Sequence, residues 1–158
     1  MWWKILLSCL LSILPLVELR GGIPLAILTG LNPWMAFLIC VFVNILIIPL
    51  AFFFLDKIHV LFLKKKFYKK TVNGFFERAK KRSQKVQKRI DDYGMVALML
   101  FVAVPLPGTG AWTGALLAWL LKLNRKKAFL AITLGVIIAG LIVTLAFTGL
   151  IALFKIFI

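Results

Sequence analysis

Acidic and metal-binding side chains are scarce in this chain of 158 residues. It has five Asp and Glu residues, one histidine and two cysteines. His59 stands among apolar residues without a second ligand nearby, and Cys9 and Cys40 lie in separate apolar runs without CxxC spacing. No nucleophile beside a base and no pair of catalytic carboxylates is recognisable. The sequence therefore predicts no enzyme and no metal or cofactor site.

Long polar stretches are also missing, since 63% of the residues are hydrophobic. A soluble domain of this length would need more polar side chains to cover its surface. A helix that spans a bilayer needs roughly 20 apolar residues. The sequence therefore predicts an all-α, multi-pass protein of the cell membrane. Its four apolar stretches are Ile5–Leu31, Trp34–Leu55, Met95–Leu121 and Ala128–Phe154.

Positive charge is abundant and confined to two blocks. The formal net charge is +15, and 17 of the 20 basic residues lie in Lys57–Arg89 and Lys122–Lys127. Basic blocks between apolar runs indicate cytoplasmic loops that face anionic lipid head groups, so nucleic acid is not an expected partner. The spacing of six residues predicts an amphipathic helix that ends at Gly94, although a solvated helical linker also fits. These six residues are Phe76, Ala79, Ser83, Val86, Ile90 and Tyr93.

Proline and glycine interrupt the first and third apolar stretches, at Pro15–Pro24 and Pro105–Gly114. Each stretch should form helix, irregular turn, helix. Because each half covers only about half of a bilayer core, the segment could cross once or return as a re-entrant hairpin. Re-entry places both basic blocks in the cytoplasm and both termini outside, as the positive-inside rule favours. We therefore predict two re-entrant hairpins and two full crossings.

The two halves resemble each other in sequence. Leu31–Leu38 and Leu123–Leu130 share five of eight residues, and each follows a broken segment and precedes a long apolar run. One crossing between equivalent points would make the repeats inverted, as in many secondary transporters. We predict a single membrane domain, 1–158, with repeats at 1–56 and 95–158 and a basic connector at 57–94. Within the first repeat, Asn44 is expected to donate an interhelical hydrogen bond.

Glu18 and Arg20 are the only charged residues well inside an apolar stretch. Such residues usually face a cavity, pair with each other or serve an ion path. A carboxyl group held away from water can exchange protons near neutral pH, and a guanidinium suits carboxylate or phosphate. The pair could therefore bind and couple, or it could be a structural ion pair that holds the hairpin tip.

The second break offers backbone donors. Pro107–Gly110 precedes a helix predicted to begin near Ala111, and the first N–H groups of a helix favour an anion. Gly110, Gly114 and Ala118 have the spacing of a close helix contact. We expect the two breaks to form one midplane site, with Glu18 as the proton-coupling residue. The predicted substrate-binding residues are Glu18, Arg20, Gly21, Gly22, Pro24, Pro105, Pro107, Gly108, Thr109, Gly110, Trp112 and Thr113.

The runs Pro-x-x-Glu-Leu-Arg-Gly-Gly-Ile-Pro at Pro15–Pro24 and Pro-Leu-Pro-Gly-Thr-Gly-Ala-Trp-Thr-Gly at Pro105–Gly114 resemble the small multidrug export protein family. The resemblance covers essentially the whole chain. That family is distantly similar to DedA-type (VTT domain) membrane proteins, which have two re-entrant hairpins in inverted halves. The similarity implies transport and, for the DedA relatives, proton-coupled movement of polyprenyl-phosphate or other lipid head groups. DedA proteins usually carry arginines in the second hairpin, where this chain has none.

The predicted function is a small, proton-coupled secondary transporter of a lipid phosphate or another amphiphilic anion. One alternative is efflux of lipophilic cationic drugs, with Glu18 as their counter-ion. The other is a lipid-binding or scaffold protein that transports nothing. The expected partners are membrane lipids, a small amphiphilic substrate and, for so small a scaffold, a second copy of the chain.

Overall fold

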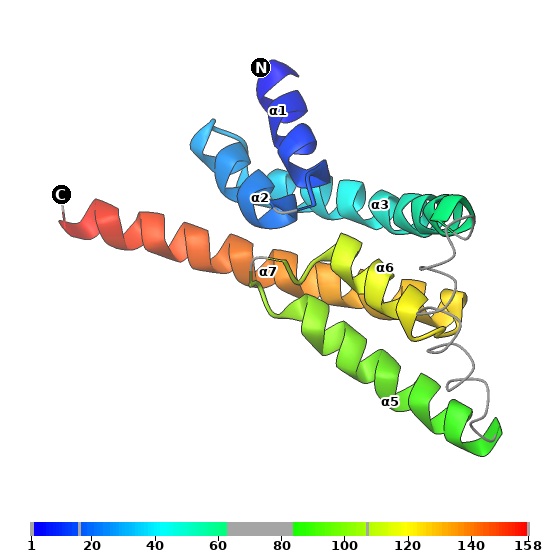
Figure 1. The fold of residues 1–158 in the computed structure, drawn as a ribbon. Coiled ribbons are helices and arrows are strands. Elements are labelled where there is room, and N and C mark those ends of the chain that lie inside the picture. Colours follow the sequence, from blue (N-terminus) through cyan, green and yellow to red (C-terminus); the bar gives the residue numbers. More distant parts are fainter. Residues whose placement is uncertain (1, 16, 63–83, 107, 158) are drawn as a thin grey trace.

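The computed structural model describes residues 2–15, 17–62, 84–106 and 108–157 (Figure 1). All regular structure in these ranges is helical, as predicted. The helices are α1 (Trp2–Ile13), α2 (Glu18–Leu28), α3 (Pro33–Phe62), α5 (Gln84–Ala103), α6 (Ala111–Leu120) and α7 (Arg125–Phe157).

The second and fourth apolar stretches form the long helices α3 and α7. Pro33–Lys57 and Arg125–Lys155 are each long and apolar enough to cross a membrane. The two helices pack against each other, and small residues let them approach closely. A Cβ atom on Gly140 of α7 would lie 2.8 Å from Val41 Cγ2 of α3. These two helices form the frame on which the shorter helices pack.

Both interrupted stretches are broken, as predicted, but the first break is shorter than expected. α1 ends at Ile13 and α2 begins at Glu18, so the run from Glu18 to Pro24 is helical and only the preceding turn is irregular. Pro24 lacks only the N–H that would bond one carbonyl of the preceding turn, a loss that apolar helices tolerate when neighbouring groups satisfy that carbonyl. The second break separates α5, which ends at Ala103, from α6, which begins at Ala111 as predicted.

The predicted sequence repeat produces the same local structure twice. In the α2–α3 turn, the N–H of Leu31 donates to the carbonyl of Ala26, and Asn32 Oδ1 accepts the N–H of Trp34. The α6–α7 turn repeats these bonds 92 positions later, with Leu123 donating to Ala118 and Asn124 accepting from Lys126. Each turn closes one helix with a Schellman pattern and caps the next with asparagine.

The predicted helix end at Gly94 is wrong. α5 begins at Gln84, inside the predicted connector, and continues through Gly94 to Ala103. A Cβ atom at Gly94 would lie 3.3 Å from Leu123 Cδ2, so the glycine allows close packing in place of a helix end. Phe76, Ala79 and Ser83, with most of the basic connector, lie outside the described residues.

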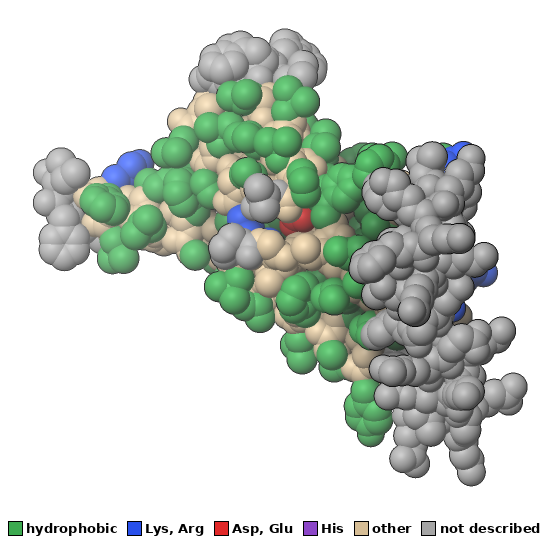
Figure 2. All heavy atoms as spheres, in the orientation of Figure 1, with side chains coloured by type: hydrophobic (Ala, Val, Ile, Leu, Met, Phe, Trp, Pro, Cys, Tyr) green, Lys and Arg blue, Asp and Glu red, His purple; other side chains and the backbone are tan. Residues whose placement is uncertain are grey.

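The outer surface of the bundle is largely apolar. Large side chains such as Leu28, Phe42 and Leu145 are more than 60% exposed. Figure 2 shows apolar side chains over much of one face, with acidic and basic atoms visible in a small area near its middle. A surface of this kind suits lipid, because lipid does not demand polar cover. The charged area lies where the two breaks meet.

Candidate functional site

The carboxylate of Glu18 reaches from the first break to the start of α6. Its Oε2 accepts the N–H of Ala111 at 3.2 Å, and its Oε1 accepts the N–H of Trp112 at 3.3 Å. Glu18 is only 2% exposed. The first N–H groups of a helix lack intrahelical partners and favour negative charge. The anion expected at this helix start is therefore supplied by the chain itself.

Glu18 has an unusual backbone conformation. Its φ is +47°, in the left-handed region that side-chain-bearing residues rarely adopt. This conformation costs roughly 1–2 kcal/mol. Such strain persists only where surrounding contacts enforce it, and it is frequent at functional sites. The hydrogen bonds from α6 are contacts of that kind.

Arg20 extends from the same turn of α2 and also contacts the second break. Its Nη1 lies 3.6 Å from Glu18 Oε2, and its Nη2 donates to Thr109 Oγ1 at 2.7 Å and to the carbonyl of Val104 at 3.1 Å. The side chain is 13% exposed. Its Nε has no partner in the described part of the chain. The guanidinium therefore links the two breaks, and its Nε–H is left available for another acceptor.

Trp112 and Thr113 have different places near this cluster. The indole Nε1 of Trp112 donates to the carbonyl of Ile13 at 3.0 Å, which satisfies the last turn of α1. Thr113 Oγ1 donates to the carbonyl of Gly110 at 3.2 Å, within the first turn of α6. Trp112 is thus the third residue that joins the two breaks, whereas Thr113 bonds within its own turn.

Among the predicted site glycines, Gly110 is the one whose missing side chain leaves room for the Glu18 carboxylate. A Cβ atom on Gly110 would lie 1.2 Å from Glu18 Oε2. At Gly21 and Gly22 the nearest atoms are Val17 Cγ1 and Ser12 Oγ, so these glycines let α2 pack against the first break and α1. Gly108 has a φ of +85° and serves the turn. Pro107 lies outside the described residues.

Arg20 lines a groove that runs along α7. Its volume is about 450 Å³, and its walls are mostly apolar. A guanidinium in the wall of an apolar groove suits a molecule with an anionic group and a hydrocarbon part. The residues that line it are Arg20, Pro24, Pro105, Ile142, Val143, Ala146, Phe147 and Leu150.

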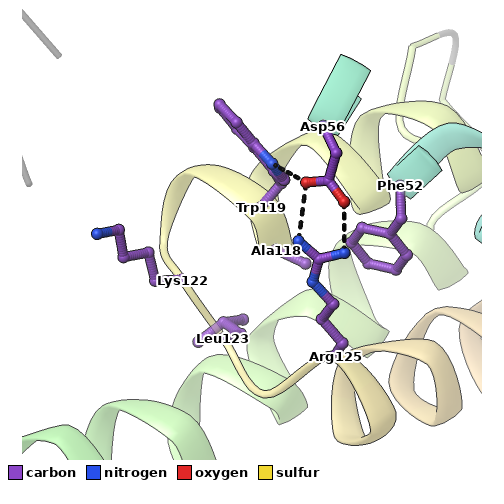
Figure 3. A pocket seen from close by; sticks show the side chains of 7 residues that line it. All are labelled: Phe52, Asp56, Ala118, Trp119, Lys122, Leu123 and Arg125. Carbon is purple, nitrogen blue, oxygen red and sulfur yellow. Dashed lines mark hydrogen bonds and ion pairs between the residues drawn. The ribbon is translucent and has the colours of Figure 1, made fainter. Parts of the chain in front are cut away.

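A second charged cluster joins the ends of three helices (Figure 3). Asp56 of α3 forms a bidentate pair with Arg125 of α7, with N–O distances of 2.7 and 2.8 Å. Trp119 of α6 donates its Nε1 to Asp56 Oδ1 at 3.0 Å. No role was predicted for Asp56 from the sequence. The missed signal was that Asp56 and Arg125 stand at ends of long helices that must lie on the same side.

α6 is therefore held near both ends by carboxylates from the first half of the chain. Glu18 accepts the N–H groups of its first turn, and Asp56 accepts the indole N–H of its penultimate residue, Trp119. Between these points α6 packs closely: a Cβ atom on Gly114 would lie 2.8 Å from Val102 Cγ2, and Ala118 is 1% exposed. The packing role predicted for Gly114 and Ala118 is confirmed.

The first half also has a buried polar core. Asn44 donates to the carbonyl of Ser12 on α1 at 3.3 Å and to that of Cys40 on its own helix at 3.0 Å. The interhelical donor role predicted for Asn44 is confirmed. Ser12 Oγ and Asn44 Oδ1 are buried without a hydrogen-bond partner in the described part of the chain.

Fold and site together define a small, all-helical membrane protein whose interrupted helices enclose one charged cluster. The chain belongs to the family described as "Putative small multi-drug export protein", whose model matches residues 18–142. The matched range contains both charged clusters. The comparisons with curated proteins and with solved structures give no match. The further similarity to DedA-type proteins stays a prediction.

Proposed function

We propose that this chain is a proton-coupled secondary transporter that moves an amphiphilic anion, with a lipid phosphate as the leading candidate. One observation carries the proposal. The Glu18 carboxylate accepts the first N–H groups of α6 and pairs with the Arg20 guanidinium, and both of these groups could otherwise bind an anion. A substrate anion and the Glu18 carboxylate would therefore compete for the same donors.

This competition provides a coupling mechanism. When Glu18 takes up a proton, its carboxyl group loses its charge and its attraction to Arg20 and the α6 dipole weakens. The anionic group of a substrate then binds the released donors. When Glu18 loses its proton, its carboxylate displaces the anion. One proton thus accompanies one negative charge, and the site is never left with an unpaired guanidinium.

The groove beside Arg20 supports an amphiphilic substrate. Its volume of about 450 Å³ accommodates a hydrocarbon chain along Ile142, Ala146 and Phe147, while Arg20 meets the charged group. Export of lipophilic cationic drugs, the alternative considered from the sequence, fits this geometry less well. A cation that used Glu18 as counter-ion would have to separate the carboxylate from Arg20 and leave a second positive charge beside it.

The proposed architecture is a pair of inverted repeats, each with a re-entrant hairpin and one crossing. α2 has 11 residues and α6 has 10, so each rises only about 15–16 Å, half of a bilayer core. Glu18 and Gly110 are 92 positions apart, as are the two Leu-Asn turns, and they meet in space. Equivalent positions meet at the axis of a two-fold repeat. Both basic blocks would face the cytoplasm and both termini the outside.

The test is transport by purified protein in liposomes with an imposed pH gradient. A fluorescent lipid phosphate and a lipophilic phosphonium cation would be compared as substrates. We expect proton-dependent movement of the anion, lost in Glu18→Gln because the amide cannot exchange the proton. Arg20→Lys should bind the substrate more weakly, since ammonium lacks the guanidinium fork. Asp56→Asn changes the other described carboxylate of the first half and serves as the matched control.

Thermal stability is measured on the same preparations. A structural ion pair predicts that activity follows stability across the series, and that outcome would overturn the coupling role. Movement of the phosphonium alone would support cation export. Binding of the anion without movement would support a lipid-binding protein.

A further inference from the structure

A cluster of buried oxygen atoms lies where α1, α2 and α3 pack together. Ser12 and Asn44 are both 0% exposed, and Ser12 Oγ and Asn44 Oδ1 have no hydrogen-bond partner in the described ranges. A buried polar atom without a partner is costly, so in a native protein it usually contacts an ordered water or an ion. From this cluster we infer a binding site for a sodium ion. The inference does not depend on the proposed transport.

Both unpartnered atoms offer lone pairs. The amide nitrogen of Asn44 donates to the carbonyls of Ser12 and Cys40. Because both partners are acceptors, the nitrogen must face them, and the amide oxygen is the atom left over. The hydroxyl oxygen of Ser12 also has lone pairs to offer. The partner that these two oxygens lack is therefore a donor or a cation.

The end of α1 favours a cation. Ser12 is the penultimate residue of this helix, which ends at Ile13. The last carbonyls of a helix carry the negative end of its dipole. In secondary transporters, such ends of interrupted helices coordinate sodium. The side chains of Ser12 and Asn44 are neutral, and calcium usually needs carboxylate ligands, so the charge of the ion should be +1.

Close packing at this place favours a small ion. A Cβ atom on Gly22 of α2 would lie 2.0 Å from Ser12 Oγ, 3.1 Å from the carbonyl oxygen of Ser8 and 3.2 Å from Cys40 Sγ. The bare backbone of Gly22 thus lets the three helices close around the oxygen atoms. Cavity size and ligand geometry decide between ions of equal charge, so we expect sodium to bind better than potassium.

The second half of the chain shows that the packing itself needs no polar atoms. Ile132 and Val136 are the residues equivalent to Cys40 and Asn44, and they are buried in the same way. Gly114, the equivalent of Gly22, keeps its close contact with Ile132. Because aliphatic side chains can build this contact, the oxygen atoms of the first half point to a ligand.

The test measures sodium binding to the full-length protein in neutral detergent, by uptake of radioactive sodium and by the shift in melting temperature. Choline chloride replaces sodium chloride at constant ionic strength, and potassium chloride is titrated in parallel. We expect sodium to raise the melting temperature until the site is saturated, because a ligand that binds only the folded state stabilises it. Potassium and choline should have no comparable effect.

Ser12→Ala separates ligand binding from folding. Without sodium this variant should be at least as stable as the parent chain, because it removes a buried hydroxyl that has no partner. Its sodium affinity should fall about tenfold, the loss expected for one contact to a charged group. Asn44→Val should also bind sodium more weakly. The matched control is Thr133→Val on α7, which removes another buried hydroxyl without a partner among the described residues and should leave sodium affinity unchanged.

Four results would overturn the site. One is a parent chain that shows no saturable response to sodium, since the cluster would then hold a buried water only. The others are equal stabilisation by potassium or choline, unchanged sodium affinity in Ser12→Ala, and an equal loss of affinity in Thr133→Val.

Discussion

The two halves of the chain use similar backbones and different side chains. At the position where the first half has Glu18, the second half has Gly110, and the Glu18 carboxylate occupies the space that a side chain on Gly110 would need. Two glutamates could not both fit there. The comparison shows that the two halves have complementary roles in this contact: one half provides the charged group and the other provides the bare backbone that receives it.

The packing of α2 and α6 shows the same difference. Gly22 and Gly114 are equivalent, and each faces the residue 18 positions later, Cys40 in the first half and Ile132 in the second. Both halves thus keep a close helix contact at this glycine, but the facing side chain is a thiol in the first half and an aliphatic group in the second. Ser8, Ser12 and Asn44 are buried around α2, whereas Val102, Ile132 and Val136 are buried around α6. The packing around α2 therefore includes several buried polar groups, whereas the packing around α6 is apolar.

The largest expected effect comes from giving Gly110 a side chain. In Gly110→Ala the new Cβ would need the position of Glu18 Oε2, so the carboxylate must leave the start of α6. A buried charge without its partners costs about 3–5 kcal/mol. We expect the free energy of unfolding, measured in detergent with a chemical denaturant, to fall by that amount. Gly149→Ala, where nothing lies within 4 Å, should change it by less than about 1 kcal/mol.

A double-mutant cycle would show whether Glu18 is the cause. In a Glu18→Gly background the space beside Gly110 is empty, and adding Gly110→Ala should then cost less than about 1 kcal/mol. An equal cost in both backgrounds would mean that Gly110 is required for its own backbone conformation and not for the contact with Glu18.

Exchanging the core chemistry between the halves should have the next largest effect. Val136 is equivalent to Asn44 and 1% exposed, so Val136→Asn would bury an amide with no partner prepared for it. That should cost about 2–3 kcal/mol. Asn44→Val loses the bonds to Ser12 and Cys40 and should cost only about 1 kcal/mol, because interhelical hydrogen bonds in membrane proteins are modest. If Val136→Asn and Asn44→Val had equal costs in the same unfolding assay, the proposed difference between the packing around α2 and around α6 would be contradicted.

Much of this comparison was predictable from sequence, because it depends on local signals. Proline and glycine place both breaks, and the repeated Leu-Asn turns follow from the capping preferences of asparagine. The structure confirms the two breaks and shows the capped turns, which were not predicted from the Leu-Asn repeat. The helix at Glu18–Pro24 was not predicted, because proline is a strong local signal and the packing of α2 against α1 and α3 is not visible in sequence.

The charged cluster at the two breaks was predicted in part for the same reason. Glu18 and Arg20 stand out because charge is rare in apolar stretches, and the start of α6 stands out as an anion-binding position. The two breaks were expected to form one site, but no sequence signal shows that Glu18 itself accepts the first N–H groups of α6, since Glu18 and Ala111 are 93 positions apart. The Asp56–Arg125 pair was missed because both residues stand at helix ends, where charge is ordinary.

A smaller effect on stability is expected from neutralising Asp56, the second carboxylate that contacts α6. The side chains of Asp56 and Arg125 are 42% and 59% exposed, so their pair is partly screened by water. Asp56→Asn should lower the free energy of unfolding by about 0.5–1 kcal/mol, and most of that loss should vanish in about 1 M salt. Any effect of Glu18→Gln on stability, at a buried position, should not depend on salt. A salt-independent effect at Asp56 would mean that the bond from Trp119 outweighs the ion pair.

The smallest effect on stability is expected from exchanging the residues at one position of the two turns, Gly30 in the first half and Lys122 in the second. Lys122 has the left-handed backbone that Gly30 has in the first half. Lys122→Gly should gain about 1 kcal/mol from the backbone and lose about 0.3–1 kcal/mol, because lysine at the end of α6 interacts favourably with the helix dipole. The net gain should be a few tenths of a kcal/mol in lipid-free detergent. Gly30→Lys should show the opposite sign for the same two reasons. If both substitutions destabilise, then the side-chain interactions of Lys122 contribute more than the backbone strain costs. The second turn would then depend on its lysine, and the two turns would be equivalent in backbone only.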